Sequence, residues 1–181
     1  MASTLDELDP AHIDWIGEQH VFFVASAPTA GGHVNLSPKG HDSLRVLGPT
    51  SVAYLDLTGS GAETIAHLRD NGRLTIMFCA YSGPPRILRL FGTGTAHALG
   101  SDRYDELAPH FDAIPGARAI IELDIDRIQT SCGFAVPFMD YRAERPTLQQ
   151  WAGRTTDDEL TQYRAAKNAT SIDGLPAIDT A

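Results

Sequence analysis

The sequence predicts a mainly β fold of the α+β class, an antiparallel barrel with only a few helices. At least six segments alternate apolar and polar residues with the period of two that is typical of half-buried strands. Helical spacing interrupts this pattern in few places, whereas a doubly wound sheet would need strands and helices in regular alternation. The six segments are residues 21–26, 33–39, 51–57, 73–80, 86–99 and 117–128.

The segment 86–99 is long for one strand, and the side chains on one of its faces become very small midway along it. Glycines at such positions let a strand bend sharply, as strands do in small barrels. We therefore expect this strand to bend around the barrel. The face concerned reads Leu88, Leu90, Gly92, Gly94 and Ala96.

Helices are expected at 60–71, at 101–110 and in two stretches after residue 144. The first of them ends at Asn71-Gly72, which is a common stop signal. We divide the 181 residues into a barrel domain, 1–143, and a helical C-terminal extension, 144–181. The extension is expected to pack on the same domain or on a dimer partner.

The start of the first helix has two interpretations. Ser60 and Glu63 have the spacing of a capping box, in which the two residues satisfy each other's backbone amides. Alternatively, Thr58, Ser60 and the free amides of the helix start receive a phosphate, helped by the positive end of the helix dipole. The motif by itself does not decide between the two.

Composition and charge exclude several classes of function. A formal net charge of −9 argues against nucleic acid and against an anionic membrane surface as partners. The acidic N-terminus lacks the apolar region of a signal peptide, and the apolar runs are too short to span a bilayer. Cys79 and Cys132 show no paired spacing. Together these features predict a cytoplasmic protein.

The common catalytic and metal-binding motifs are missing from the sequence. There is no phosphate loop of the GxxxxGK type, no HExxH spacing among the seven histidines and no GxSxG. We therefore predict no metal site and assign no catalytic side chain. Cys132 is either a reactive thiol or a small packed residue.

The cations offer a more specific signal. Lys39 extends the polar face that Asn35 and Ser37 form on the second predicted strand. Arg86 and Arg89 lie three residues apart in one strand, so their side chains leave opposite faces. Lys39 and Arg89 either build an anion site or are surface charges that keep a sheet soluble.

Three stretches carry a resemblance to a known family: "HVNLSPKG", "SVAYLDLTGSGAETIAHLRDNGRLTIMF" and "PPRILRLFGTG". Over roughly residues 15–127 the chain resembles the pyridoxamine 5′-phosphate oxidase-related, FMN-binding split-barrel family. The stretch "QTSCGFAVP" resembles one bacterial branch of it. The resemblance implies a six-stranded antiparallel split β-barrel with short peripheral helices and a helical C-terminal region.

The same resemblance implies a function. The expected protein is a homodimer with one FMN in each of two clefts between subunits, an FMN-dependent oxidoreductase that acts on a small molecule. Alternatives are a reductase of the same fold that uses a deazaflavin coenzyme, a non-catalytic flavin- or haem-binding protein, and a flavin-free barrel kept for dimer contacts. Hydride acceptance would belong to the flavin.

Site residues follow from the resemblance position by position. The flavin phosphate is expected at the end of the second strand, at the junction of the third strand with its helix, and on the basic strand that follows. Glu63-Thr64 stand where phosphate-binding members usually have an Arg-Lys pair, and Ile87 stands where they have a flavin-binding glutamine. The implied phosphate contacts are Asn35, Ser37, Lys39, Thr58, Ser60, Thr64 and Arg86 or Arg89; Cys132, Gly133 and Phe134, with Trp151 of the other subunit, would lie near the ring.

Overall fold

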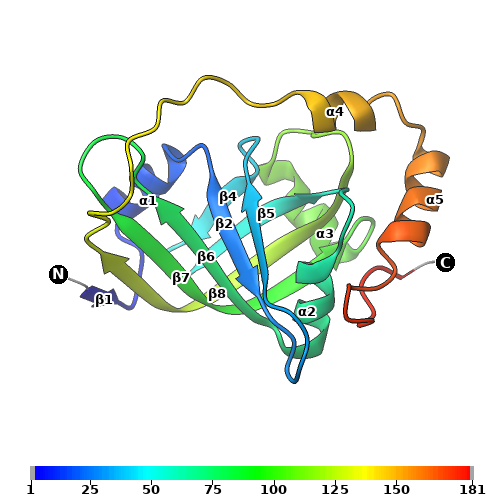
Figure 1. Ribbon diagram of the computed structural model, residues 1–181, viewed down its shortest axis with the longest axis horizontal. Helices are drawn as coiled ribbons and strands as arrows, with labels where there is room; N and C mark the ends of the chain where they lie inside the picture. The colour runs from blue at the N-terminus through cyan, green and yellow to red at the C-terminus, as the bar shows by residue number, and fades with distance from the viewer. Residues whose placement is uncertain (1–2, 180–181) are drawn as a thin grey trace.

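The computed structural model describes residues 3–179, which form one strongly curved sheet with helices around it (Figure 1). All strand pairs are antiparallel. The strands are β1 Ser3–Leu5, β2 Phe22–Ser26, β3 Asn35–Lys39, β4 Leu44–Gly48, β5 Ser51–Leu57, β6 Arg73–Cys79, β7 Ile87–Ala98 and β8 Ala117–Ser131.

The strand order makes this sheet a split barrel. The path runs β3-β2-β6-β7-β8-β5-β4, with β1 added beside β8. β3 and β4 follow each other in the chain, yet they lie at the two ends of the path and leave a seam between them. The predicted mainly β split barrel is confirmed, with eight strands in the described part of the chain instead of six.

The two additional strands carry little of the expected pattern. β1 has only three residues, which is too short to show a period. β4 reads LRVLG, and all five of its residues are half-buried, so apolar and polar positions do not alternate. Both strands exist because a neighbouring strand pairs with them, β8 in one case and β5 in the other.

β7 bends where the sequence predicts it. Its register with β8 shifts between Phe91 and Gly92, as at a β-bulge. A Cβ atom at Gly92 would lie 1.9 Å from the Asp124 carbonyl oxygen, and one at Gly94 would lie 2.8 Å from a methyl carbon of Leu74. At Gly92 only glycine allows the two backbones to approach this closely, so the bend depends on it.

The helices after residue 60 lie within the predicted stretches, whereas the helix Pro10–Gly17 was not among them and one start differs. α2 begins at Glu63, three residues later than expected, with Ala62 at the N-cap and no side-chain cap. The predicted capping box of Ser60 and Glu63 is wrong, because Glu63 Oε1 accepts a hydrogen bond from the Ile172 amide, 109 residues away. The Glu63 carboxylate is therefore hydrogen-bonded to a distant backbone amide and does not cap its own helix. The helices are α1 Pro10–Gly17, α2 Glu63–Asn71, α3 Asp102–Leu107 with a 3₁₀ turn Ala108–His110, α4 Thr147–Ala152 and α5 Asp157–Lys167.

The barrel interior holds the main core. Side chains of β2, β5, β6, β7 and β8 fill it, together with apolar residues of α1 and α2. A second, smaller core lies on the other face of β5 and β8, where Tyr104 and Leu107 of α3 pack against Leu55 and Ile120. β5 and β8 are therefore buried on both faces. This burial holds the end of β5 and the turn that follows it in a fixed position.

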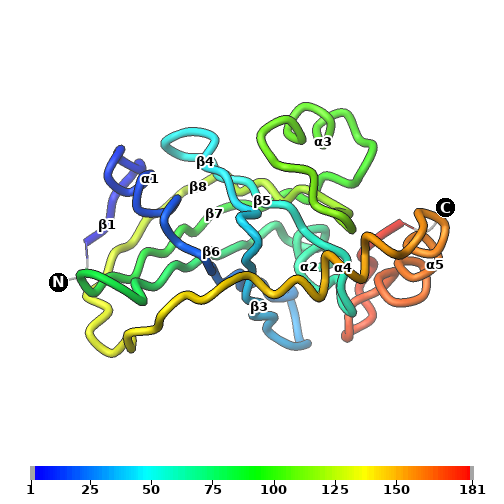
Figure 2. The backbone as a smooth tube through the Cα atoms, turned by 90° about the horizontal axis from the view of Figure 1, so that it is seen from above, coloured from blue at the N-terminus to red at the C-terminus, as the bar shows by residue number. Residues whose placement is uncertain are grey.

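The C-terminal region returns to the barrel of its own chain. After β8 the segment 132–146 runs across the molecule without regular structure and leads into α4 and α5 (Figures 1 and 2). The last described residues then pack against α2, where Arg69 Nη1 donates to the Ala177 carbonyl. No helix within residues 3–179 combines the length and the apolar character needed to cross a membrane.

Candidate functional site

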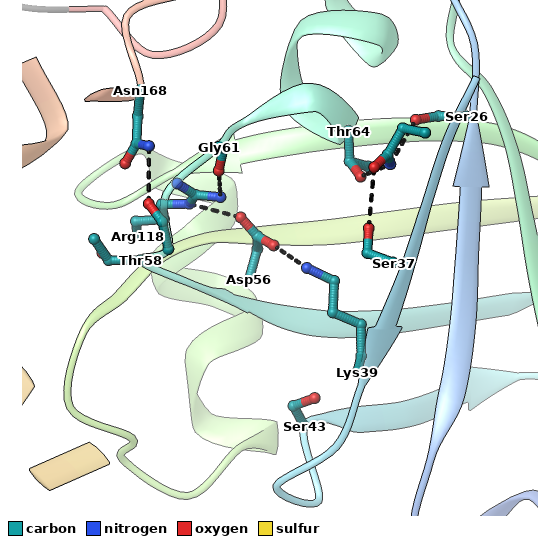
Figure 3. Close-up of polar contacts among 12 residues, drawn as sticks. Ser26, Ser37, Lys39, Ser43, Asp56, Thr58, Gly61, Thr64, Arg118 and Asn168 are labelled. Carbon is teal, nitrogen blue, oxygen red and sulfur yellow. Dashed lines mark hydrogen bonds and ion pairs between the residues drawn. The ribbon is translucent and has the colours of Figure 1, made fainter. Parts of the chain in front are cut away.

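A buried carboxylate with two cations marks the end of β5. Asp56 is 1% exposed and lies on the inner face of the barrel. Lys39 Nζ donates to its Oδ1 at 2.8 Å, and Arg118 Nε donates to its Oδ2 at 2.7 Å. Figure 3 shows the two cations approaching Asp56 from opposite sides. Lys39 comes from the edge strand β3, so its ion pair bridges the seam of the barrel.

The electrostatics of this cluster keep Asp56 ionised. Burial raises the pKa of its carboxyl, but the charges of Lys39 and Arg118 lower it by more, so the pKa lies below the ordinary value. The cluster carries two positive charges against one negative charge, which leaves one positive charge in excess.

Arg118 has an unused donor. Its Nη2 donates to the Gly61 carbonyl at 2.8 Å, in the turn that leads into α2. Its Nη1 is buried and has no hydrogen-bond partner within residues 3–179. Arg118 is only 7% exposed, and a buried donor without a partner carries a free-energy cost.

A third cation approaches from the C-terminal extension. Arg164 Nε donates to the Thr58 hydroxyl at 2.9 Å, and its Nη2 donates to the Ala117 carbonyl at 3.2 Å. Burial, and after it the charge of Arg118, lowers the pKa of Arg164. Positive charge is therefore concentrated around the turn that follows β5.

Hydroxyl and amide groups line the barrel next to the cluster. Asn35 Nδ2 donates to Thr64 Oγ1 at 3.0 Å and lies 3.2 Å from Ser26 Oγ. Ser37 Oγ donates to Asn35 Oδ1 at 3.3 Å, and Ser26 Oγ also lies 3.0 Å from Nδ1 of the buried His67. The structure thus brings together three of the sequence-predicted residues, Asn35, Ser37 and Thr64.

A cavity of about 510 Å³ opens on the other side of the same turn. Small-molecule sites usually measure roughly 300–1,000 Å³. The rings of Trp151 and Tyr163 meet edge to face at 5.1 Å between centroids. The cavity collects three further predicted residues, Thr58, Ser60 and Trp151, and here Trp151 faces the site of its own chain. Its lining is His41, Thr58, Gly59, Ser60, Arg145, Thr147, Leu148, Trp151 and Tyr163.

The remaining predicted residues lie elsewhere. The Arg86 guanidinium lies 5.1 Å from the centroid of the Trp15 ring, and Arg89 Nη1 donates to Ser131 Oγ at 3.2 Å. Cys132 is exposed and its thiol is free. None of the three lines the cavity or contacts Asp56.

Lys39 and Arg89 do not converge within one chain. Lys39 pairs with Phe22 and shares the face of Leu90, whereas Arg89 pairs with Met77 on the opposite face. Opposite residues of antiparallel strands share a face, so the two cations project to the inside and to the outside of the barrel. Arg118, which the sequence analysis missed, takes the position beside Lys39.

Four important residues escaped the sequence analysis: Asp56, Arg118, Arg164 and Asn168. Asp56 is a lone acid in the otherwise apolar strand SVAYLDL, and this was the signal that could have marked it. Asn168 is completely buried, and its Nδ2 donates to the Gly59 carbonyl at 3.0 Å. Nothing in the local pattern around Arg164 or Asn168 indicates these contacts.

Comparisons with known proteins agree with the architecture. Residues 8–132 match the family model described as pyridoxamine 5′-phosphate oxidase. The chain is 44% identical over 185 aligned residues to "Pyridoxamine 5′-phosphate oxidase family protein ustO" of Aspergillus flavus, covering 93% of this chain and 74% of that protein. The barrel and its sequence therefore define a protein of the split-barrel class. The chain belongs to the pyridoxamine 5′-phosphate oxidase family.

Solved structures show the same fold at low sequence identity. HupZ of Group A Streptococcus superposes with a TM-score of 0.52 at 22% identity, covering 67% of this chain and 91% of that one. A putative pyridoxamine 5′-phosphate oxidase of Lactobacillus delbrueckii gives 0.53 at 17% identity, covering 68% and 94%. Both likenesses concern the fold alone. Within residues 3–179, no group of three or more His, Cys, Asp or Glu side chains is arranged to hold a metal ion.

Proposed function

We propose that this chain is a cytoplasmic, homodimeric, FMN-dependent oxidoreductase that acts on a small molecule. The observation that carries the proposal is the excess of buried positive charge around Asp56, next to an aromatic-lined cavity, in a barrel of this family. FMN combines the two kinds of group that such a site accommodates, a phosphate and a planar ring.

The residues fit a phosphate-bearing flavin. Lys39 and Arg118 supply the charge that a phosphate needs, and Arg118 Nη1 is a donor without a partner among the described residues. Trp151 and Tyr163 supply aromatic faces in the cavity. Glu63 at the first position of α2 disfavours a phosphate held by helix amides alone, so the cations of β3 and β8 carry the charge balance.

The chain's own residues would bind, orient and shield, while FMN when bound would supply hydride acceptance. The hydroxyls of Ser37, Ser60 and Thr64 would hydrogen-bond polar parts of a ligand. Leu148, Trp151 and Tyr163 would offer apolar and aromatic surface to a ligand in the cavity. No side chain is assigned as a proton donor or acceptor.

The outer face of the barrel supports a second copy as partner. Phe23, Met77, Ile87 and Phe91 on this face are only half-buried. Large apolar side chains in and before β3 and in the segment after β8 are exposed to a degree that favours a protein interface. These side chains are Val34 (76% exposed), Leu36 (63%), Phe134 (82%), Phe138 (83%) and Met139 (58%). Arg89 lies on the same face and would enter a cleft between two copies.

The test begins with the visible spectrum of freshly purified protein and mass spectrometry of the ligand released on denaturation. The protein is then titrated with FMN and, side by side, with a deazaflavin coenzyme, and the bound flavin is mixed with NAD(P)H and with a substrate panel that includes pyridoxamine 5′-phosphate. Tight FMN binding with reduction and reoxidation supports the proposal. A colourless protein that binds no FMN at micromolar concentrations contradicts it, and a bound flavin that never turns over indicates a carrier.

A further inference from the structure

The turn from β5 into α2 combines two features that favour an anion, although Glu63 places a negative charge at the first position of α2. α2 has nine residues and no side-chain cap at Ala62, so the amides of its first turn lack the usual side-chain acceptor. Arg118 places its guanidinium on the carbonyl of Gly61, directly before this helix start. The positive end of the helix dipole and the guanidinium charge therefore act on the same place.

The ion cluster at Asp56 carries more positive than negative charge. Asp56 accepts from both Lys39 and Arg118, so one carboxylate serves two cations. The side chains of Asp56 and Arg118 are 2% and 5% exposed, and a buried positive charge without a counter-charge is costly. An anionic group at the free edge of the guanidinium would remove that cost.

The free edge of the Arg118 guanidinium is defined by the contacts of its two other nitrogens. Nε of Arg118 is held by Asp56 and Nη2 by Gly61, so the orientation of the guanidinium plane is fixed. Nη1 remains as a donor without a partner within residues 3–179. Glu63, two residues after Gly61, accepts with Oε1 from the Ile172 amide of the C-terminal tail, and its Oε2 is buried without a hydrogen-bond partner within residues 3–179.

We propose that Arg118 Nη1 donates to the phosphate of the bound cofactor, and that Asp56 is the positioning residue that orients Arg118 and Lys39 for this contact. This assignment rests on the proposed FMN function and specifies which cation of the chain binds the phosphate. It assigns a binding role to a residue of β8 that the resemblance does not indicate.

The experiment compares FMN with riboflavin, which has the same ring and ribityl chain but no phosphate. Dissociation constants for both are measured by quenching of flavin fluorescence in full-length protein. Arg118→Gln is expected to weaken FMN binding by about tenfold or more, the effect of a lost charged hydrogen bond, and to leave riboflavin binding within about twofold. Arg118→Lys keeps the charge, but one ammonium group cannot contact Asp56, Gly61 and a phosphate together. The FMN affinity of this variant is therefore expected to lie between that of the wild type and that of Arg118→Gln.

Two further variants are included, one in case Arg118→Gln fails to fold and one as a control. Asp56→Asn with Arg118→Gln replaces the ion pair by two neutral amides and avoids a stranded buried carboxylate if the single change fails to fold. Arg103→Gln is the matched control, since Arg103 Nε also donates to a carboxylate, that of Glu122 at 3.1 Å, but on α3. The double variant is expected to lose the preference for FMN over riboflavin, and the control to keep it.

The outcomes separate this inference from the proposed function. If wild-type protein prefers FMN and the Arg118 variants keep that preference, the inference is wrong and the function stands. If wild-type protein binds neither flavin, the function fails, and inorganic phosphate becomes the probe. Protection of the wild type against thermal unfolding by phosphate, absent in the Arg118 variants, then supports the anion site, whereas equal or no protection overturns it.

Discussion

Arg164 in α5 donates a hydrogen bond of 2.9 Å to the hydroxyl of Thr58, 106 residues earlier in the chain. Thr58 in turn donates to the Gly116 carbonyl at 2.8 Å. One guanidinium therefore links the C-terminal extension, the end of β5 and the loop before β8. The turn at the candidate site is held in place from both sides, which makes the extension part of the site's support.

Removing this link is expected to loosen α5. Arg164→Ala should lower the free energy of unfolding by about 2 kcal/mol, the usual value for a charged hydrogen-bond donor, and should expose α5 to proteolysis. Urea denaturation and limited proteolysis measure the two effects. Arg154→Ala, in the exposed connection before α5, is the matched control and should change neither. Equal behaviour of the two variants would contradict the role of Arg164.

The opposite orientations of Lys39 and Arg89 predict complementation between subunits. In the proposed dimer, a cleft combines Lys39 of one copy with Arg89 of the other. Lys39→Ala and Arg89→Ala proteins should each bind FMN poorly. When the two are unfolded together and refolded as a mixture, about one quarter of the sites should regain both cations. FMN titration of the mixture measures the recovery, and a mixture no better than its components would place both residues outside a shared cleft.

Acid should weaken the contribution of Asp56 to stability. Its pKa is lower in the folded chain than the value of about 3.9 in an unfolded one. The ion pairs therefore contribute fully above about pH 4 and are lost as the pH falls toward the lower folded-state pKa. The difference in unfolding free energy between wild type and Asp56→Asn should be largest near neutral pH and should shrink below about pH 4.

Urea unfolding at a series of pH values measures that difference. Asp126→Asn is the control, because Asp126 is exposed on β8. Its difference from the wild type should stay small throughout. If the difference in unfolding free energy between wild type and Asp56→Asn does not change with pH, the Asp56 carboxyl has the same pKa in the folded and unfolded chain, and the prediction is wrong.

The bend of β7 should not tolerate a methyl group. At Gly92 an added Cβ would meet the Asp124 carbonyl oxygen at 1.9 Å, and this oxygen is a backbone atom that cannot rotate away. Gly92→Ala should therefore cost about 3 kcal/mol or more, beyond the usual range for overpacking. Gly17→Ala at the end of α1, where no atom lies within 4 Å, should be neutral or slightly stabilising. Thermal unfolding of both variants checks the contrast.

Local patterns in the sequence were sufficient for much of the fold. Alternation identified the long strands, and the vanishing face of 86–99 located the bend at Gly92, because a missing Cβ is itself a local fact. The polar face of Asn35, Ser37 and Lys39 was also visible, since a period of two determines which residues of a strand share a face.

Only the tertiary structure decided what that face meets. A period of two does not say which face is turned inward, so the separation of Lys39 from Arg89 required the registers of three strand pairs. Asp56 finds its cations 17 and 62 residues away, and Glu63 leaves its local motif for an amide 109 residues away. Pairing of charges depends on distance in space, and a sequence specifies that distance only after the strands have closed into a barrel.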